Sequence, residues 1–145
     1  MDIRKYNGLI SNKNLNQTLV SEFLYKHLEQ YGDKLESINK AIDYALSEKD
    51  EKGGLLIVGY EDKTIVGAVV VNKTGMSGYI PENILVYIAV DSNKRGKGYG
   101  KKLMEATIKE TEGDIALHVE ANNPAKKLYE QLGFTNPYLE MRLIK

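Results

Sequence analysis

The organisation of this chain is clearest in one segment, Val90-Asp91-Ser92-Asn93-Lys94-Arg95-Gly96-Lys97-Gly98-Tyr99-Gly100-Lys101-Lys102-Leu103-Met104. An apolar run that predicts a buried strand, Ile84 to Val90, leads into it, and it continues into apolar residues at helical spacing. A glycine-rich turn at the start of a helix presents backbone N–H groups without intrahelical partners, at the positive end of the helix dipole. Arg95, Lys97, Lys101 and Lys102 add positive charge, and no acidic residue lies between Asp91 and Glu105. The segment therefore predicts a binding site for a phosphate-bearing ligand.

The composition favours a single compact domain over residues 1–145 and excludes several function classes. Lys plus Arg and Asp plus Glu number 20 each, so the zero net charge gives no support for a nucleic-acid-binding or membrane-surface protein. The chain has no cysteine, which excludes disulfides and thiolate catalysis, and its only histidines, His27 and His118, are too far apart in sequence to suggest a metal site. No apolar stretch reaches the roughly 18 residues of a membrane span, and the N-terminus lacks a signal-peptide pattern, so we expect a cytoplasmic protein without a membrane partner.

Helical periodicity dominates the first third of the chain. Apolar residues from Leu15 to Tyr31 predict one helix, with Asn14 and Gln17 at the spacing of a capping pair. Asp33 and Glu36 have the same spacing before a second helix that extends to Leu46. Gly53-Gly54 marks a change to strands.

The remaining chain predicts a mixed α/β arrangement. Leu55 to Tyr60 and Thr64 to Val71 read as a hairpin that is apolar on both faces, which indicates a sheet covered on both sides. After the strand at Ile84–Val90, we expect a helix from Gly98 to about Glu110 and a strand over Ile115 to Val119. A short helix is expected next, with Asn122-Asn123 as its cap, Pro124 at its first position and Gly133 just after its end. A final strand is expected within Phe134 to Ile144, where Leu139, Met141 and Leu143 alternate with polar residues.

The glycine pattern matches neither of two common nucleotide-binding motifs. A P-loop needs a glycine where Arg95 stands and Ser or Thr where Lys102 stands, and the dinucleotide fingerprint fails at its third glycine. The pattern that fits is Arg-x-x-Gly-x-Gly, residues 95–100, and it resembles the main signature of the GNAT superfamily of acyl-CoA-dependent N-acetyltransferases. The second signature of that family resembles Asn122, Ala125, Leu128-Tyr129 and Leu132-Gly133-Phe134, so the resemblance covers about residues 84 to 135.

This resemblance implies a GNAT-type α/β fold, a mixed, twisted β-sheet flanked by helices with two splayed central strands. It implies a transferase that moves an acetyl group from acetyl-CoA to a primary amine by direct attack in a ternary complex, without a metal. The resemblance implies that the glycine turn binds the pyrophosphate of the coenzyme and that the backbone of the preceding strand pairs with pantetheine. One asparagine is also expected to contact the coenzyme. The residues in this set are Ile88, Ala89, Val90, Arg95, Gly96, Lys97, Gly98, Tyr99, Gly100, Lys101 and Asn122. A β-bulge is the physical device for such splaying.

The resemblance also implies catalytic residues. Tyr129 occupies the position of the general acid that protonates the departing thiolate, although Leu128-Tyr129 also fits an apolar helix stripe. Asn122 fits both a pantetheine contact and a helix cap. Glu82 is the candidate general base; Glu120 is an alternative, and both also fit solvated charges at strand ends. His118 alternates away from the apolar residues of its strand and is a further candidate, although a lone histidine is more often structural.

Three functions therefore remain open at the level of sequence. The first is an N-acetyltransferase acting on a small-molecule or peptide amine. The second is a CoA-binding regulatory module without activity, and the third is an anion- or nucleotide-binding protein. No cysteine is present and no serine lies in a nucleophile-elbow motif, so a covalent acyl-enzyme has no support. The acceptor is not identified, and a homodimer is compatible with the sequence.

Overall fold

The computed structural model describes residues 1–9, 14–49 and 53–145. The strands in this described part are β1 (Asp2–Tyr6), β2 (Gly54–Glu61), β3 (Thr64–Lys73), β4 (Asn83–Val90) and β5 (Ile115–Leu117). The α-helices are α1 (Gln17–His27), α2 (Leu35–Ala45), α3 (Tyr99–Glu110) and α4 (Lys126–Gln131), with 3-10 turns at Glu29–Tyr31 and Ser92–Lys94.

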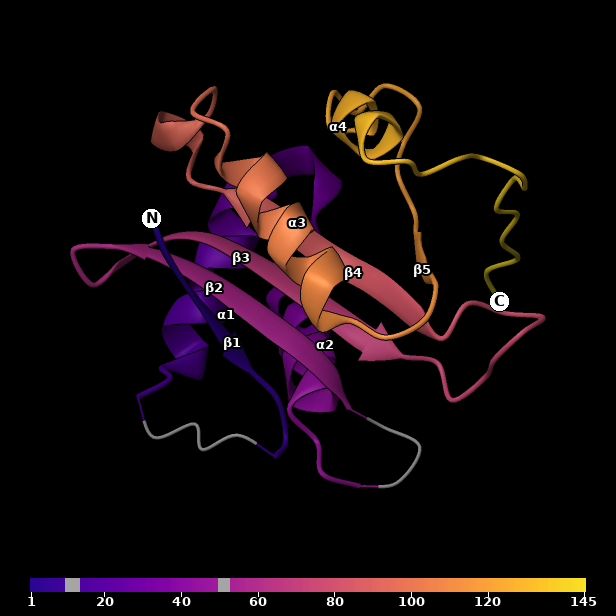
Figure 1. Cartoon of the computed structure of the whole chain (residues 1–145), viewed down its shortest axis with the longest axis horizontal. Helices are drawn as coiled ribbons and strands as arrows, with labels where there is room; N and C mark the ends of the chain where they lie inside the picture. Colours follow the sequence, from indigo (N-terminus) through magenta and orange to yellow (C-terminus); the bar gives the residue numbers. More distant parts are fainter. Residues whose placement is uncertain (10–13, 50–52) are drawn as a thin grey trace.

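The strands form one mixed sheet whose order follows the sequence, β1-β2-β3-β4-β5. The pairs from β1 to β4 are antiparallel, whereas β4 and β5 are parallel and enclose α3 between them in sequence. Helices α1 and α2 lie on one face of the sheet and α3 on the other, as Figure 1 shows. This confirms the expected mixed, two-sided α/β arrangement.

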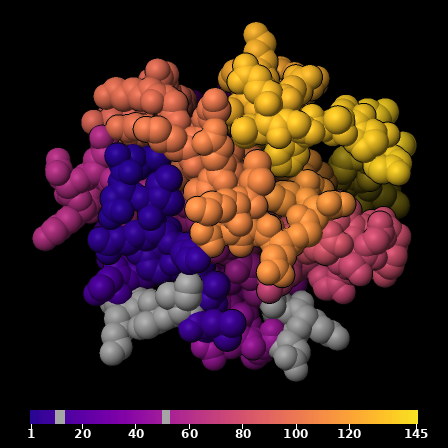
Figure 2. Space-filling model, in the orientation of Figure 1, coloured from indigo at the N-terminus to yellow at the C-terminus, as the bar shows by residue number. Residues whose placement is uncertain are grey.

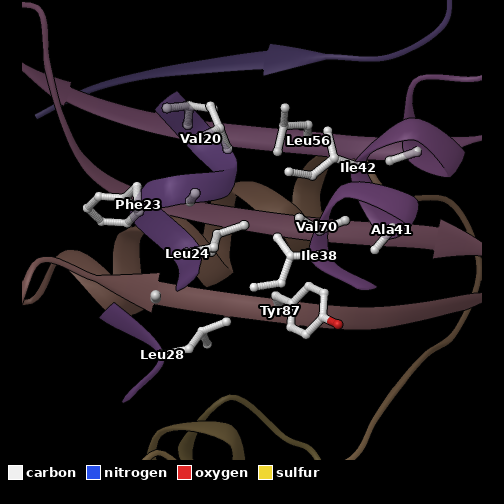
Figure 3. Packing of buried hydrophobic residues seen from close by; sticks show 14 of the residues in the cluster. Val20, Phe23, Leu24, Leu28, Ile38, Ala41, Ile42, Leu56, Val70 and Tyr87 are labelled. Atoms are coloured by element: carbon white, nitrogen blue, oxygen red, sulfur yellow. The ribbon is translucent and has the colours of Figure 1, made fainter. Parts of the chain in front are cut away.

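Two apolar clusters fill the space on either side of the sheet. Figure 3 shows the cluster beneath α1 and α2, where Leu24, Ile38 and Leu56 are fully buried. The opposite cluster joins Leu103 and Met104 of α3 to side chains of β2, β3 and β4 and to Tyr129 of α4. Side chains alternate along a strand, so β2 and β3 need apolar residues on both faces, as their sequences have.

The centre of the sheet is irregular in β4. Val70 pairs with Tyr87 but Val71 pairs with Leu85, so Val86 is an extra residue opposite β3, which defines a β-bulge. β4 pairs with β5 only over Asn83 to Leu85. The rest of β4, as far as Val90, therefore has a strand neighbour on one side only. The bulge and this short pairing are the splayed central strands that the resemblance implies.

Several local expectations are wrong. Strand β1 was not expected before the helices, and β5 ends at Leu117 rather than Val119. The cap of α1 is Asn16, not Asn14, because the Asn16 Oδ1 accepts a hydrogen bond from the Leu19 amide at 3.1 Å. Asp33 does not cap α2, which follows Lys34 without a side-chain cap.

The end of the chain also differs from its prediction. Residues 134–145, all of which the structure describes, contain no helix or strand, so the expected final strand is wrong. Alternation predicts a strand only where a neighbouring strand accepts its hydrogen bonds, and none does so here. Helix α4 begins at Lys126 with Pro124 in the preceding turn, and it is Asn123 whose Oδ1 accepts from the Ala125 amide at 2.9 Å. Gly133 does follow the helix end, with φ +100°.

Among residues 1–9, 14–49 and 53–145, no helix has both the length and the apolar content that crossing a bilayer requires.

Candidate functional site

The glycine turn joins the end of β4 to the start of α3. The backbone has φ +80° at both Gly96 and Gly98, and Gly98 is the N-cap of the helix. The Lys102 amide donates to the Gly98 carbonyl at 3.1 Å, which closes the first turn of α3. The amides of Tyr99, Gly100 and Lys101 precede that bond and so point out of the helix end without an intrahelical acceptor. The turn therefore presents a row of N–H donors at the positive end of α3.

The C-terminal end of α1 holds this turn in place. The Ser92 amide donates to His27 Nδ1 at 3.1 Å, and Arg95 Nη2 donates to the His27 carbonyl at 2.9 Å. Arg95 Nη1 also lies 3.2 Å from Glu29 Oε1. Burial lowers the pKa of His27, so its imidazole stays neutral and can accept at Nδ1. The Arg95 side chain thus joins the glycine turn to the end of α1.

Tyr99 fastens the other side of the turn to the hairpin. Its hydroxyl donates to Glu61 Oε2 at 2.6 Å, and Lys94 Nζ lies 3.4 Å from Glu61 Oε1. These bonds lower the pKa of Glu61, with the Tyr99 hydrogen bond as the main cause. Lys97 is exposed and Lys101 lies 3.9 Å from Glu105 one turn along α3. These lysine side chains are therefore available to an anion at the turn, since such exposed pairs are weak.

The unpaired edge of β4 continues the row of donors. The Asp91 amide donates to the Val66 carbonyl on β3 at 2.9 Å. Because successive residues of a strand direct their amides to opposite sides, Ala89 also faces β3, whereas Ile88 and Val90 face the gap that β5 leaves open. Of the three strand residues expected at the coenzyme, Ile88 and Val90 therefore present main-chain hydrogen-bonding groups to the gap.

Helix α4 forms a wall beside the start of α3. A Cβ built on Gly100 would lie 3.4 Å from Leu128 Cδ2 and 3.8 Å from Val90 Cγ2, so three elements meet at this glycine. After α4, the Gly133 amide donates to the Glu130 carbonyl and the Phe134 amide to the Tyr129 carbonyl, which is a Schellman motif. The Phe134 ring packs at 5.9 Å from the Tyr129 ring. The helix end thus fixes the ring of Tyr129.

The Tyr129 hydroxyl is a hydrogen-bond donor that is open to another molecule. Its side chain is buried in the cluster beneath α3, and burial raises its pKa to about 12. The described residues provide no hydrogen-bond partner for its hydroxyl. The phenol is therefore protonated at neutral pH and free to donate to another molecule.

A hydrogen-bonded pair of polar side chains, Tyr87 and Asp33, lies on the α1/α2 side of β4. The bulge places both Val86 and Tyr87 against the cluster on this side, and the Tyr87 hydroxyl donates to Asp33 Oδ2 at 2.6 Å. Burial and this bond raise the pKa of Tyr87. Tyr31, two residues before Asp33, donates to the Asn122 carbonyl at 3.4 Å. No sequence signal links Asp33 to Tyr87, 54 positions away, and sequence reasoning missed the pair.

The structure does not bring Glu82 to this region. Glu82 Oε1 accepts from the Asp114 amide at 2.8 Å, and that bond lowers the pKa of Glu82. Glu82 precedes β4, so its main chain lies eight residues and about 26 Å from Val90, at the other end of the strand. Its observed role is to join the start of β4 to the loop before β5.

The remaining candidates lie just beyond β5. Ile115, Leu117 and Val119 contribute to the cluster beneath α3, so alternation places His118 and Glu120 toward α1 and α2, where both are exposed. Asn122 is exposed and uses its carbonyl toward Tyr31; the cap of the following turn is Asn123. Within the described residues, no group of three or more His, Asp or Glu side chains is placed to hold a metal ion.

Comparisons with known proteins agree with this geometry. Residues 52–136 match the family model "Acetyltransferase (GNAT) domain", which is more than half of the chain. The fold resembles a ribosomal-protein-alanine N-acetyltransferase from Brucella melitensis biovar Abortus 2308, with TM-score 0.66, 16% identity and 100% of each chain covered. It also resembles the aminoglycoside N-acetyltransferase AAC(6')-Iy in complex with CoA (TM-score 0.65, 17% identity, 99% of this chain and 95% of that chain covered). A chain of the NatC complex bound to Gag peptide and CoA is similar at TM-score 0.69 and 20% identity, covering 93% of this chain and 86% of that one. No curated protein matches the sequence.

Proposed function

The chain belongs to the GNAT acetyltransferase family, and on this basis we propose that it transfers the acetyl group of acetyl-CoA to a primary amine in a ternary complex. One observation carries the proposal. The free amides at the start of α3 continue into the main-chain groups of Ile88 and Val90 along the open edge of β4. A diphosphate followed by an arm with two amides needs such a sequence of donors and acceptors.

The chain's own residues fit the coenzyme at each part of this path. The amides from Gly98 to Lys101 point out of the α3 terminus and bind the pyrophosphate, and the exposed side chain of Lys97 adds positive charge. Ile88 and Val90 pair with the pantetheine arm as an added strand would. The bulge at Val86 turns β4 where this open edge begins.

Acetyl-CoA supplies an activated acetyl thioester. In the transfer, the amine nitrogen bonds to the thioester carbon, the carbon–sulfur bond breaks, the amine loses a proton and the thiolate gains one. The Tyr129 hydroxyl gives the proton to the sulfur, since the phenol is protonated at neutral pH and none of the described residues accepts its hydrogen bond. Holding the amine and the thioester in contact supplies much of the remaining rate enhancement.

On the α1/α2 face, Asp33 and Tyr87 replace Glu82 as the groups that receive the amine proton. The Tyr87 hydroxyl already donates to the Asp33 carboxylate at 2.6 Å. A proton that reaches the Tyr87 oxygen is therefore balanced by one that passes from Tyr87 to Asp33. The bulge brings Tyr87 to the segment of β4 that lacks β5 as a neighbour, so the relay begins at the gap.

The acceptor is a primary amine of a small molecule or a peptide. Proteins of similar fold carry the names of an aminoglycoside acetyltransferase and of a ribosomal-protein-alanine acetyltransferase, so the fold alone accommodates both kinds of acceptor. The elements over the acceptor face here are α1, α2 and the turn between them, which carries Tyr31 and Asp33.

The test combines coenzyme binding with turnover. Calorimetry with CoA measures binding, and release of free thiol from acetyl-CoA in a panel of primary amines measures transfer. We expect binding, turnover with at least one amine, and loss of turnover but not of binding in Tyr129→Phe. Tight CoA binding without turnover across small amines, polyamines, aminoglycosides and peptides would favour the alternative, a CoA-binding regulatory module.

A further inference from the structure

One histidine holds the glycine turn at two points. The Ser92 amide donates to His27 Nδ1 at 3.1 Å, and Arg95 Nη2 donates to the carbonyl of the same histidine at 2.9 Å. The 3-10 turn Ser92–Lys94 leads directly to Arg95 and Gly96. Figure 2 shows the turn and the start of α3, in coral and orange, at the surface of the molecule. His27 itself is only 8% exposed, so it contacts this surface turn from the interior.

The bond to Ser92 requires one protonation state of His27. An amide N–H can only donate, so Nδ1 must carry a lone pair and the proton of the neutral ring must lie on Nε2. In the imidazolium both ring nitrogens are donors, and the Ser92 amide then faces another N–H. Protonation of His27 therefore breaks this hydrogen bond and leaves the Ser92 amide without that acceptor.

The charged groups around His27 lie on both sides of this contact and have opposing effects on its pKa. Burial has the largest effect and lowers the pKa of His27 from its ordinary value of 6.5. Asp91, just after β4, and Glu29, in the 3-10 turn after α1, raise the pKa. Lys26 on α1 and Arg95 lower it. The ring is therefore neutral at neutral pH and takes up a proton only in more acidic solution.

We propose that His27 is a positioning residue for the coenzyme: its neutral ring holds Ser92 where the amides at the start of α3 are aligned, and its protonation weakens CoA binding. The inference rests on the proposed function, since it concerns the turn that we assign to the pyrophosphate. Gly98, the N-cap of α3, lies only six residues beyond Ser92. On the other side of Ser92, the Asp91 amide is bound to the Val66 carbonyl of β3, so loss of the His27 bond releases the turn and not the strand.

Protonation of His27 has two opposite effects on CoA binding. The lost hydrogen bond releases the turn and weakens binding, whereas the added positive charge attracts the phosphates of CoA. Salt weakens that attraction more than it weakens the hydrogen bond, so we expect the lost bond to dominate at about 0.15 M salt. The loss of one hydrogen bond corresponds to a fall in affinity of about 2- to 10-fold.

Calorimetry with CoA between about pH 5 and 8, on the wild type, His27→Asn and His27→Leu, tests the inference. The asparagine Oδ1 is bonded to Cγ, as Nδ1 is in histidine, so it can accept from the Ser92 amide at every pH. Leucine fills the space without an acceptor. At pH 8 we expect the wild type and His27→Asn to bind CoA equally, and His27→Leu to bind about 2- to 10-fold more weakly. As the pH falls, we expect the wild type to approach His27→Leu while His27→Asn keeps its advantage.

The ratio of affinities at each pH is the quantity to compare, because the phosphates of CoA titrate near pH 6 themselves. This titration is common to the three proteins and cancels in the ratio. Thermal unfolding of each protein checks that the fold is retained. A ratio of wild-type to His27→Asn affinity that stays constant, or that rises as the pH falls, would overturn the inference.

Amide-resolved NMR of the free protein measures the turn without the coenzyme. In the wild type we expect the Ser92 amide and the amides of residues 98–101 to shift with the same midpoint as the His27 ring. In His27→Asn we expect no such transition. A Ser92 amide that did not follow the ring would also overturn the inference. Absence of CoA binding in all three proteins at every pH would refute the proposed function, and the NMR titration would still decide whether His27 sets the turn.

Discussion

Replacing Gly98 by alanine tests the conformation of the turn separately from its packing. Gly98 has φ +80°, and a Cβ built on it meets no atom within 4 Å. The substitution therefore adds no clash, and its cost is the backbone strain of a left-handed residue with a side chain, about 1–2 kcal/mol. In a domain of this size such a cost corresponds to a fall in melting temperature of roughly 3–8 °C.

The strain free energy can appear as a loss of stability in the free protein or as a loss of affinity for CoA. The two losses together must equal the whole strain free energy. If the variant keeps the turn, the protein loses stability and CoA binding is unchanged. If the variant relaxes the turn, the stability is retained but CoA must restore the conformation, which weakens binding by about 5- to 30-fold for the same 1–2 kcal/mol. Thermal unfolding without ligand and calorimetry with CoA measure the two parts.

Gly100→Ala is the matched control. Its φ is not positive, and a Cβ there lies in ordinary contact with Leu128 at 3.4 Å and Val90 at 3.8 Å. Because alanine favours the helix over glycine by up to about 1 kcal/mol, we expect Gly100→Ala to be at least as stable as the wild type. If Gly98→Ala lost neither stability nor affinity, or if the two variants behaved alike, the assignment of a strained turn that presents amides to CoA would be wrong.

Three further predictions concern individual side chains. Tyr129→Phe keeps the buried ring but removes the proton donor, so acetyl transfer falls by about 10²–10⁴-fold in steady-state assays while CoA affinity is unchanged; an equal loss of both would indicate a structural role. Asp33→Asn removes the proton acceptor beside Tyr87, and we expect the rate of acetyl transfer to fall by about 10²-fold while CoA affinity is unchanged; an unchanged rate would exclude the relay. Burial lowers the pKa of His27 in the folded state, so stability is complete above its unfolded pKa of about 6.5 and declines as the pH falls below it through the folded pKa. In His27→Gln, we expect the melting temperature to lose this part of its dependence on pH between about pH 5 and 8. If the melting temperatures of the wild type and the variant changed in parallel with pH, the argument would be contradicted.

Strands β2 and β3 and helix α3 were predictable because their local sequence patterns agree with the way they pack in the fold. β2 and β3 are apolar on both faces and α3 has an apolar stripe after a glycine cap, so the strand–turn–helix unit and the two-sided sheet follow from pattern alone. The resemblance added the position of Tyr129. The signature in residues 95–100 located the free amides that the structure places at the start of α3.

The errors arise where long-range contacts override local signals. β1 has only Ile3 and Tyr6 as clear apolar residues and is a strand because it pairs with β2. Asp33 has the spacing of a cap, but its carboxylate accepts from Tyr87, on a strand 54 residues away. Leu139, Met141 and Leu143 alternate with polar residues as in a strand, yet no strand in the described part of the chain pairs with them. Glu82 stands at the entrance of β4, and its contact with the Asp114 amide, 32 residues away, was not visible in the sequence.

An amide-resolved NMR titration with CoA tests the account most directly, because the account rests on which main-chain groups face the coenzyme. We expect the largest shifts at Gly98 to Lys101 and at Ile88 and Val90, with Ala89, which faces β3, much less affected. Binding that shifted other amides and left the α3 terminus unchanged, or the absence of any shift at millimolar CoA, would contradict the account.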